Sequence, residues 1–453
     1  MWYVSSRSKA ERVDFSEAAL TGLARDGGLF IPEEIPAYPQ RVVSSLGSMA
    51  LLDIATETIK PYTHPVMPQA VLEDLVESAF SFPAPLISVG DRMVLELFHG
   101  PTAAFKDFGA RFMARTFSYL RRNEDTPLRI LVATSGDTGG AVADGFFGVP
   151  GIEVTVLYPK GRVSPLQERQ IAGVGGNISA LAVEGSFDDC QALVKAAFSD
   201  EALRSRLTLS SANSINITRL IPQAVYYAVA AGRAFSGETD SDQEATPRIS
   251  GGEAADATYH PRAKNPARFC VPSGNFGNLT AGLYAMKMGA PIAGFIAATN
   301  SNATVPDYLA TGNYAPRPSR ATISNAMDVG APSNFERMAA HWSHRELREM
   351  IQGVSVSDDE TRSTIEQVYT RYGYCVDPHT AVGWRGVDRL AREQALPPGP
   401  LAVLATAHPA KFAEITEGLA GPAPIPPSLR NVMDRAVTAQ SIPADISALK
   451  DML

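Results

Sequence analysis

Residues 129–143 are Arg-Ile-Leu-Val-Ala-Thr-Ser-Gly-Asp-Thr-Gly-Gly-Ala-Val-Ala. The apolar run Ile130–Ala133 is short and bounded by turn residues, which predicts a strand buried in a parallel sheet. The glycines that follow predict a tight loop, and the small residues after them predict a helix. Free backbone amides at the start of such a helix can hold a carboxylate or a phosphate. The stretch therefore predicts an α/β fold with an anion site in this loop.

A second stretch repeats the pattern. Arg268–Pro272 predicts a strand, Ser273–Asn278 a glycine loop, and Leu279–Met288 a helix. Further buried-type strands are predicted at 93–97, 154–157 and 401–405, with helical patterns between them. Strands that alternate with helices are typical of a parallel sheet. One such loop is an ordinary strand-to-helix connection, but two loops beside a reactive side chain indicate a site.

The reactive side chain is predicted to be Lys106, within Leu97–Gly109. Packing between Phe105 and Phe108 would remove water from the amine and favour its neutral form, ready for a Schiff base with a carbonyl cofactor. A lysine followed by an aspartate, here Asp107, is more often a surface ion pair. The two glycine loops favour the functional interpretation.

Composition limits the function. The 453 residues are 45% hydrophobic and 19% charged, which is enough for two or three domains. A net charge of -8 argues against nucleic acid as a partner. The sequence contains no apolar run of about 18 residues, so a membrane span is not expected. With no export signal at the N-terminus, a cytoplasmic protein is expected. Cys190, Cys270 and Cys375 are widely spaced and are expected to be reduced.

Two other site types are disfavoured. The glycine loops give neither Gly-x-x-x-x-Gly-Lys-Ser/Thr nor Gly-x-Gly-x-x-Gly, so ATP and NAD are poorly supported. His341 and His344 lie at helical spacing but have no evident third ligand, so no metal site is expected.

Seven segments together carry a family resemblance. They are Asp26–Pro32, Leu97–Gly109, Ser135–Gly139, Tyr158–Gln167, Ser211–Arg219, Ser273–Asn278 and Ala405–Phe412. In these segments, and in their order, the chain resembles threonine synthase in the longer form found in many bacteria and fungi. That enzyme belongs to the fold-type-II family of pyridoxal-phosphate enzymes, which also contains tryptophan synthase β and the serine/threonine dehydratases.

The resemblance implies an α/β fold with two parallel-sheet domains, helices on both faces of each sheet, and a mostly helical N-terminal domain. The expected boundaries are 1–90 for the N-terminal domain, and 91–235 with 267–453 for the two parts of the catalytic core. Residues 236–266 are rich in Ser, Gly, Asp, Glu, Thr and Pro, and are expected to form a mobile polar insertion.

The resemblance also implies how pyridoxal 5'-phosphate is bound. Lys106 would bind it covalently and shuttle protons at Cα, Cβ and Cγ of the substrate. Thr406 would face the pyridine nitrogen, where a neutral hydroxyl does not enforce protonation. Asp137 would repel the phenolate oxygen, so an amide from Asn213 or Asn216 is the candidate partner of that oxygen. The cofactor phosphate would be held by Gly274, Asn275, Phe276, Gly277 and Asn278.

Substrate contacts are implied as well. The α-carboxylate of the substrate would be held by Ser135, Gly136, Asp137, Thr138 and Gly139. Arg219 is the best candidate for the substrate's own phosphate, and Lys160 comes second.

The implied reaction converts O-phospho-L-homoserine and water to L-threonine and inorganic phosphate, in a monomer or a homodimer. A related phospho-lyase would use the same site and release a keto acid, and the sequence separates the two poorly. A serine or threonine dehydratase would not need the cation Arg219. From another class, the chain could be a cofactor-binding scaffold without activity, against which the intact Lys106 argues.

Overall fold

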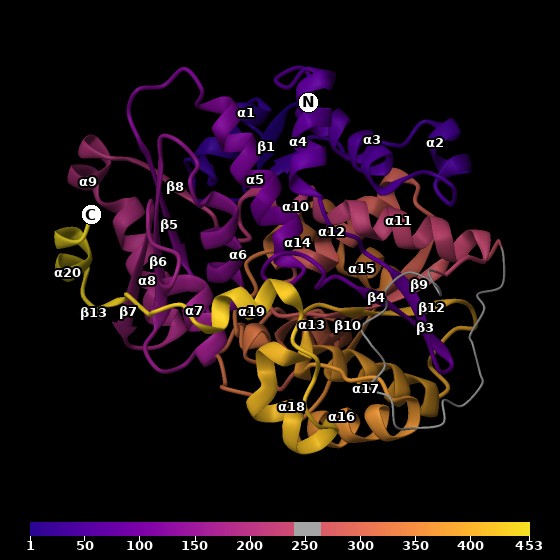
Figure 1. Ribbon diagram of the computed structural model, residues 1–453. Helices are drawn as coiled ribbons and strands as arrows, with labels where there is room; N and C mark the ends of the chain where they lie inside the picture. Colours follow the sequence, from indigo (N-terminus) through magenta and orange to yellow (C-terminus); the bar gives the residue numbers. More distant parts are fainter. Residues whose placement is uncertain (240–263) are drawn as a thin grey trace.

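The computed structural model describes residues 1–239 and 264–453 and contains two large sheets beside a two-stranded one (Figure 1). Residues 240–263, most of the predicted 236–266 insertion, lie outside the described residues. The predicted α/β class, with parallel-sheet domains, is confirmed.

The first large sheet is entirely parallel and has the strand order β13-β7-β6-β5-β8. Leu131, Leu157 and Val183 pack on one face with residues of α8, Phe187–Ser199. Ile130, Val132 and Val156 belong to the core on the opposite face. Both faces are buried, which explains why the strands are continuous apolar runs. The strands are β5 (Leu128–Ala133), β6 (Ile152–Pro159), β7 (Ile178–Glu184), β8 (Thr208–Ser211) and β13 (Gln440–Pro443).

The second large sheet has the order β11-β10-β9-β12-β4-β3 and is parallel except for β3, which runs antiparallel at the edge. Cys270, Ile296 and Val403 pack on one face with α17, Pro378–Arg392. The other face packs against α11 and α12. The strands are β3 (Leu86–Val89), β4 (Arg92–Glu96), β9 (Ala267–Pro272), β10 (Ile292–Thr299), β11 (Ile351–Ser355) and β12 (Leu401–Ala405).

The N-terminal region is mostly helical, as predicted. Its helices α3 and α4 pack against α11 and α5 of the core, along the upper edge in Figure 1. The elements are β1 (Tyr3–Ser5), α1 (Phe15–Thr21), β2 (Phe30–Pro32), α2 (Gln40–Ser45), α3 (Leu51–Thr63) and α4 (Gln69–Ala79).

The remaining elements connect the strands and cover the sheets. They are α5 (Lys106–Leu120), α6 (Asp137–Phe146), α7 (Pro165–Ala172), α9 (Glu201–Arg206), α10 (Ile217–Leu220), α11 (Gln223–Ser236), α12 (Gly277–Met288), α13 (Thr304–Thr311), η1 (Asn325–Met327), α14 (Phe335–His341), α15 (His344–Met350), α16 (Asp358–Tyr372), η2 (Pro409–Phe412), α18 (Ala413–Ala420), α19 (Pro427–Met433) and α20 (Ile446–Asp451). Within residues 1–239 and 264–453, none of the helices has the length and apolar character needed to cross a membrane.

The two sheets do not follow the order of the chain. Strands β3 and β4 precede the first sheet in sequence but belong to the second, and the C-terminal β13 returns to the first sheet beside β7. The chain therefore crosses between the sheets more than once. In parallel sheets, ligands bind at the carboxyl ends of the strands.

Candidate active site

A pocket lies at the carboxyl ends of strands from both large sheets. Its wall comes from the loops after β5, β8, β9 and β12, and from the first residues of α5 and α17. The predicted site residues that line it are Lys106, Ser135, Asp137, Thr138, Asn213, Arg219, Gly274, Asn275, Phe276, Gly277, Asn278 and Thr406.

Lys106 is the first residue of α5 and lies beside the end of β12. The Phe105 amide donates to the Thr406 carbonyl at 2.9 Å, and Ala104 forms a bridge with Ala407. Only 15% of the Lys106 side chain is exposed. Burial lowers the pKa of Lys106 to about 8, against the opposing charge of Asp137 and with help from nearby cations. The sequence-based expectation of a desolvated lysine therefore agrees with its surroundings.

This depressed pKa predicts a pH effect on stability. The pKa of Lys106 is about 8 in the folded chain and 10.5 as its ordinary value, so between these pH values the unfolded chain binds more protons. The free energy of unfolding should therefore rise with pH in this window, by about 3 kcal/mol for this group. Chemical denaturation of cofactor-free protein at pH 7.5 and pH 10 measures it. Lys106→Met should lack this rise, and an equal rise in the variant would contradict the assignment.

The loop between β9 and α12 is shaped for close approach of a ligand. A Cβ on Gly274 would lie 2.7 Å from Cα of Met327, so only glycine fits there. Phe276, the residue before α12, is in the left-handed region with φ 60°. Such a loop exposes amides at a helix N-terminus, where an anion is stabilised.

Asn278 adds an unpaired donor to this loop. Its Oδ1 accepts hydrogen bonds from the hydroxyls of Tyr226 and Tyr227, at 2.7 and 2.6 Å. Its Nδ2 is buried and has no hydrogen-bond partner in the part of the chain that the structure describes. A buried donor without a partner is costly, so a bound acceptor in the pocket would relieve it.

Gly274→Ala should weaken cofactor binding, because the new Cβ forces the loop away from Met327. We expect a dissociation constant for pyridoxal phosphate that is about 10 to 100 times higher, equivalent to about 1.4 to 2.8 kcal/mol. Titration of cofactor-free protein, followed by absorbance, measures it. The matched control is Gly418→Ala, in α18, where the added Cβ meets open space. Equal affinity in both variants would contradict the role of Gly274.

The loop between β5 and α6 presents only part of the predicted set. Thr134 Oγ1 accepts hydrogen bonds from the amides of Gly136 and Gly139, at 2.9 and 2.8 Å. These two amides are therefore engaged within the loop. Ser135, Asp137 and Thr138 are the members that line the pocket.

The structure separates the two candidate asparagines. Asn213 lines the pocket, and its Nδ2 donates to the Ala133 carbonyl at 2.7 Å. Asn216 is buried elsewhere: its Oδ1 caps α10, and its Nδ2 donates to the Ala19 carbonyl at 2.8 Å. Asn216 therefore does not line the pocket, since the N-cap position turns its side chain toward its own helix. The sequence alone could not show which of these two asparagines faces the site.

The two candidate cations also differ. Arg219 is 1% exposed, lines the pocket and donates from Nη1 to the Ala212 carbonyl at 2.7 Å. Burial lowers the pKa of Arg219 to about 10, which still leaves it charged. Lys160 does not line the pocket: its side chain is 53% exposed, and its Nζ lies 3.1 Å from Glu184 Oε1. The structure therefore places Lys160 at the surface and not at the predicted substrate position, because the turn after β6 carries its side chain toward solvent.

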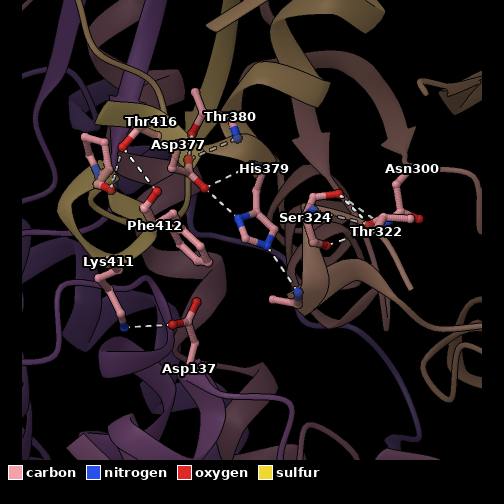
Figure 2. A network of polar contacts seen from close by, with 12 residues as sticks. Asp137, Asn300, Thr322, Ser324, Asp377, His379, Thr380, Lys411, Phe412 and Thr416 are labelled. Carbon is pink, nitrogen blue, oxygen red and sulfur yellow. Dashed lines mark hydrogen bonds and ion pairs between the residues drawn. The ribbon is translucent and has the colours of Figure 1, made fainter. Parts of the chain in front are cut away.

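Three buried polar residues were not predicted. His379 lines the pocket, Asp377 lies beside it, and Lys411 lies behind Asp137 (Figure 2). Lys411 belongs to a segment that carries the family resemblance, and an isolated lysine among apolar residues there is the same signal that singled out Lys106. His379 is the last residue of the motif Asp377-Pro378-His379, whose aspartate and proline indicate a helix start.

Asp377 and His379 hold one wall of the pocket. Asp377 caps α17, and its Oδ2 lies 2.6 Å from His379 Nδ1. His379 Nε2 accepts a hydrogen bond from the Ala326 amide at 3.2 Å (Figure 2). Because Ala326 and Met327 face Gly274, this chain of contacts fixes the wall opposite the glycine loop.

Comparison with known families covers nearly the whole chain. Residues 93–407 match the pyridoxal-phosphate dependent enzyme family, residues 2–80 the N terminus of threonine synthase, and residues 380–453 its C-terminal part. The chain is 42% identical to threonine synthase of Escherichia coli over 451 residues, covering 98% of this chain and 97% of that protein.

Solved structures agree with these matches. The crystal structure of threonine synthase from Escherichia coli superposes with a TM-score of 0.86 at 40% identity, covering 100% of this chain and 99% of that one. The structure of threonine synthase from Brucella melitensis, with bound pyridoxal phosphate, gives a TM-score of 0.85 at 35% identity, covering 100% and 98%.

Proposed function

The chain belongs to the threonine synthase family of pyridoxal-phosphate dependent enzymes, and we propose that its pocket converts O-phospho-L-homoserine and water to L-threonine and inorganic phosphate. The observation that carries this proposal is the meeting of Lys106 with the buried cation Arg219 in one pocket. A lysine alone suits many amino-acid substrates. A buried arginine beside it suits a substrate with a second anionic group.

The enzyme uses pyridoxal 5'-phosphate. The pocket fits this group: it offers the amine of Lys106, the close-packed glycine loop and the unpaired Nδ2 of Asn278. The loop from Gly274 to Asn278 would hold the cofactor phosphate, and Thr406 would face the pyridine nitrogen. When bound, the cofactor withdraws electrons from the substrate carbons and makes their protons more acidic.

Lys106 carries the proton transfers. Its amine removes a proton from Cα and one from Cβ, returns one proton at Cγ, and returns the other at Cα after water has added at Cβ. Burial supports this role, because a pKa of about 8 lets the amine gain and lose protons near neutral pH. One base that reaches three adjacent carbons needs a substrate held on one face.

The surrounding side chains hold the substrate. Ser135 and Thr138 lie at the start of α6 and would bind the α-carboxylate, where the helix N-terminus favours negative charge. Asn213 is the proposed partner of the cofactor's phenolate oxygen. Its side chain also contacts the end of β5, which fixes its position.

Arg219 would bind the phosphate of the substrate. Its Nε is buried without a hydrogen-bond partner within residues 1–239 and 264–453, so the guanidinium retains an unused donor. Gly109 of α5 has no side chain, which lets α10 approach: a Cβ there would lie 2.7 Å from the Arg219 carbonyl. The bond from Cγ to the phosphate oxygen breaks, the hydroxyl of water bonds to Cβ, and the remaining proton of water leaves with the phosphate, which balances the reaction.

The product test is direct. Purified enzyme with bound cofactor is mixed with O-phospho-L-homoserine, and the products are followed by NMR with an assay for free phosphate. We expect L-threonine and phosphate to appear in equal amounts. Phosphate with a keto acid would instead identify the related phospho-lyase, and no turnover would support a cofactor-binding scaffold.

We further infer a cytoplasmic enzyme that acts as a monomer or a homodimer on a small-molecule substrate, without nucleic acid. The net charge of -8 and free cysteines at 190, 270 and 375 support this. The proposed domains are 1–90 and a catalytic core formed by 91–235 with 267–453. The two large sheets support two subdomains in this core, and each sheet takes strands from both segments.

A further inference from the structure

Lys411 is a buried lysine that the proposed reaction does not use. Its side chain is fully buried in η2. Its Nζ lies 2.7 Å from Asp137 Oδ1 and donates to the Thr102 carbonyl at 2.8 Å. A lysine is almost never fully buried unless it is paired. This contact therefore requires an explanation beyond packing.

Asp137 lies between two lysines. Its Oδ1 accepts from Lys411 and also from Gln167 Nε2 at 2.9 Å. Its Oδ2 is 3.8 Å from Lys106 Nζ. In Figure 2 the dashed line from Lys411 ends at Oδ1 of Asp137. The two oxygens thus have separate partners, and the carboxylate cannot turn without losing a hydrogen bond.

A carboxylate at this place creates an electrostatic problem. Without a second cation, Asp137 would bind the ammonium of Lys106 strongly and keep it protonated, and it would repel the anionic groups of the cofactor and substrate. The ammonium of Lys411 offsets the negative charge of Asp137 through its contact with Oδ1. Burial would raise the pKa of Asp137, but the charges of Lys411 and Lys106 outweigh it and hold that pKa well below its ordinary value.

We propose that Lys411 is a positioning residue, which fixes Asp137 and cancels its charge so that Lys106 can act as a neutral amine. This inference rests on the proposed role of Lys106 in proton transfer. Lys411 does not line the pocket and acts through Asp137.

Other charged groups surround this trio. Arg219 of α10, Asp107 of α5, and Asp377 with His379 of α17 all act electrostatically on one of its members. Arg219 opposes protonation of Lys106, and Asp377 favours it. Of these groups, none forms an ion pair with Asp137 among the described residues, whereas Lys411 does so at 2.7 Å. Lys411 is therefore the group to change.

The first test is Lys411→Met, which keeps an unbranched side chain and removes the charge. Asp137 then acts on Lys106 without compensation, so the acidic limb of the kcat profile should move up by about one pH unit. At pH 7, kcat should fall about tenfold and recover in alkaline buffer. The profile of kcat is used because it reports groups in the enzyme–substrate complex.

Asp137→Asn should move the same limb in the opposite direction, because Lys411 then repels a proton on Lys106 without a carboxylate between them. The double variant Lys411→Met with Asp137→Asn has no net charge at the pair, and its limb should return toward that of the unmodified enzyme. Opposite single shifts with recovery in the double variant form a coupling that packing does not produce.

A second readout does not depend on turnover. The pH at which the visible absorbance of the bound cofactor changes should shift in the same variants, and thermal unfolding shows whether each is folded. The matched control is Lys195→Met, on the exposed face of α8, which should leave both profiles unchanged.

Three results would overturn the inference: a folded Lys411→Met with an unshifted limb, a loss of kcat that is equal at every pH, or a double variant no better than Lys411→Met. If Lys411→Met does not fold, an unshifted or upward limb in Asp137→Asn overturns it instead. If unmodified enzyme gives no threonine, the proposed function fails, while the absorbance titration still tests Lys411.

Discussion

Lys106→Ala is expected to abolish threonine formation, with kcat lower by at least about 10⁴-fold. General acid–base catalysis by one group contributes about 10² to 10⁴, and here one amine serves three carbons, so no other group replaces it. The measurement is single-turnover formation of threonine, with mass spectrometry to detect loss of covalent cofactor. Of these two lysines, Lys106 lines the pocket, whereas Lys411 does not line it and contacts Asp137 Oδ1.

The control for this variant is Lys287→Ala, an exposed lysine of α12. It should form threonine at the unmodified rate and keep its cofactor. Unchanged thermal unfolding of Lys106→Ala would show that the loss is chemical. Threonine formed by Lys106→Ala at more than a hundredth of the normal rate would refute the mechanism.

Arg219→Met is expected to lower kcat/KM for O-phospho-L-homoserine by about 10² to 10³. Loss of a buried charge-assisted hydrogen bond costs about 3 to 4 kcal/mol, and the leaving phosphate loses its cation. Steady-state kinetics measures this. Inhibition by L-homoserine, which lacks the phosphate, should be unchanged, because its amino acid part does not need the guanidinium.

Arg206→Met, in the exposed last turn of α9, is the matched control and should leave kcat/KM unchanged. If Arg219→Met weakened L-homoserine and the phosphorylated substrate equally, Arg219 would support the pocket as a whole. The assignment to the substrate phosphate would then be wrong.

Local patterns in the sequence explain what could be predicted. The strand and glycine loop around Ser135, the similar unit around Gly274, and Lys106 each lie within one short stretch, and the structure brings these stretches to one pocket. The apolar runs predicted strands because both faces of each sheet are covered.

What could not be predicted depends on contacts between distant segments. The pairing of β13 with β7 could not be predicted, because a strand of four residues has too short a sequence pattern to specify its partner strand. Asn213 and Asn216 differ only in which one caps a helix. Lys160 directly follows the end of β6 and Lys411 lies six residues after the end of β12, yet the first reaches solvent and the second reaches Asp137.

The contact between Lys411 and the Thr102 carbonyl joins positions that are 309 residues apart. A ribosome adds about 5 to 20 residues per second, so roughly 15 to 60 seconds separate the synthesis of the two partners. During that interval the nascent chain already holds Lys106 and Asp137, but not the ammonium that balances them. Beyond Lys411, the strand that completes the edge of the first sheet emerges last. The charge set of Lys106, Asp137 and Lys411 is therefore complete only when translation is almost finished.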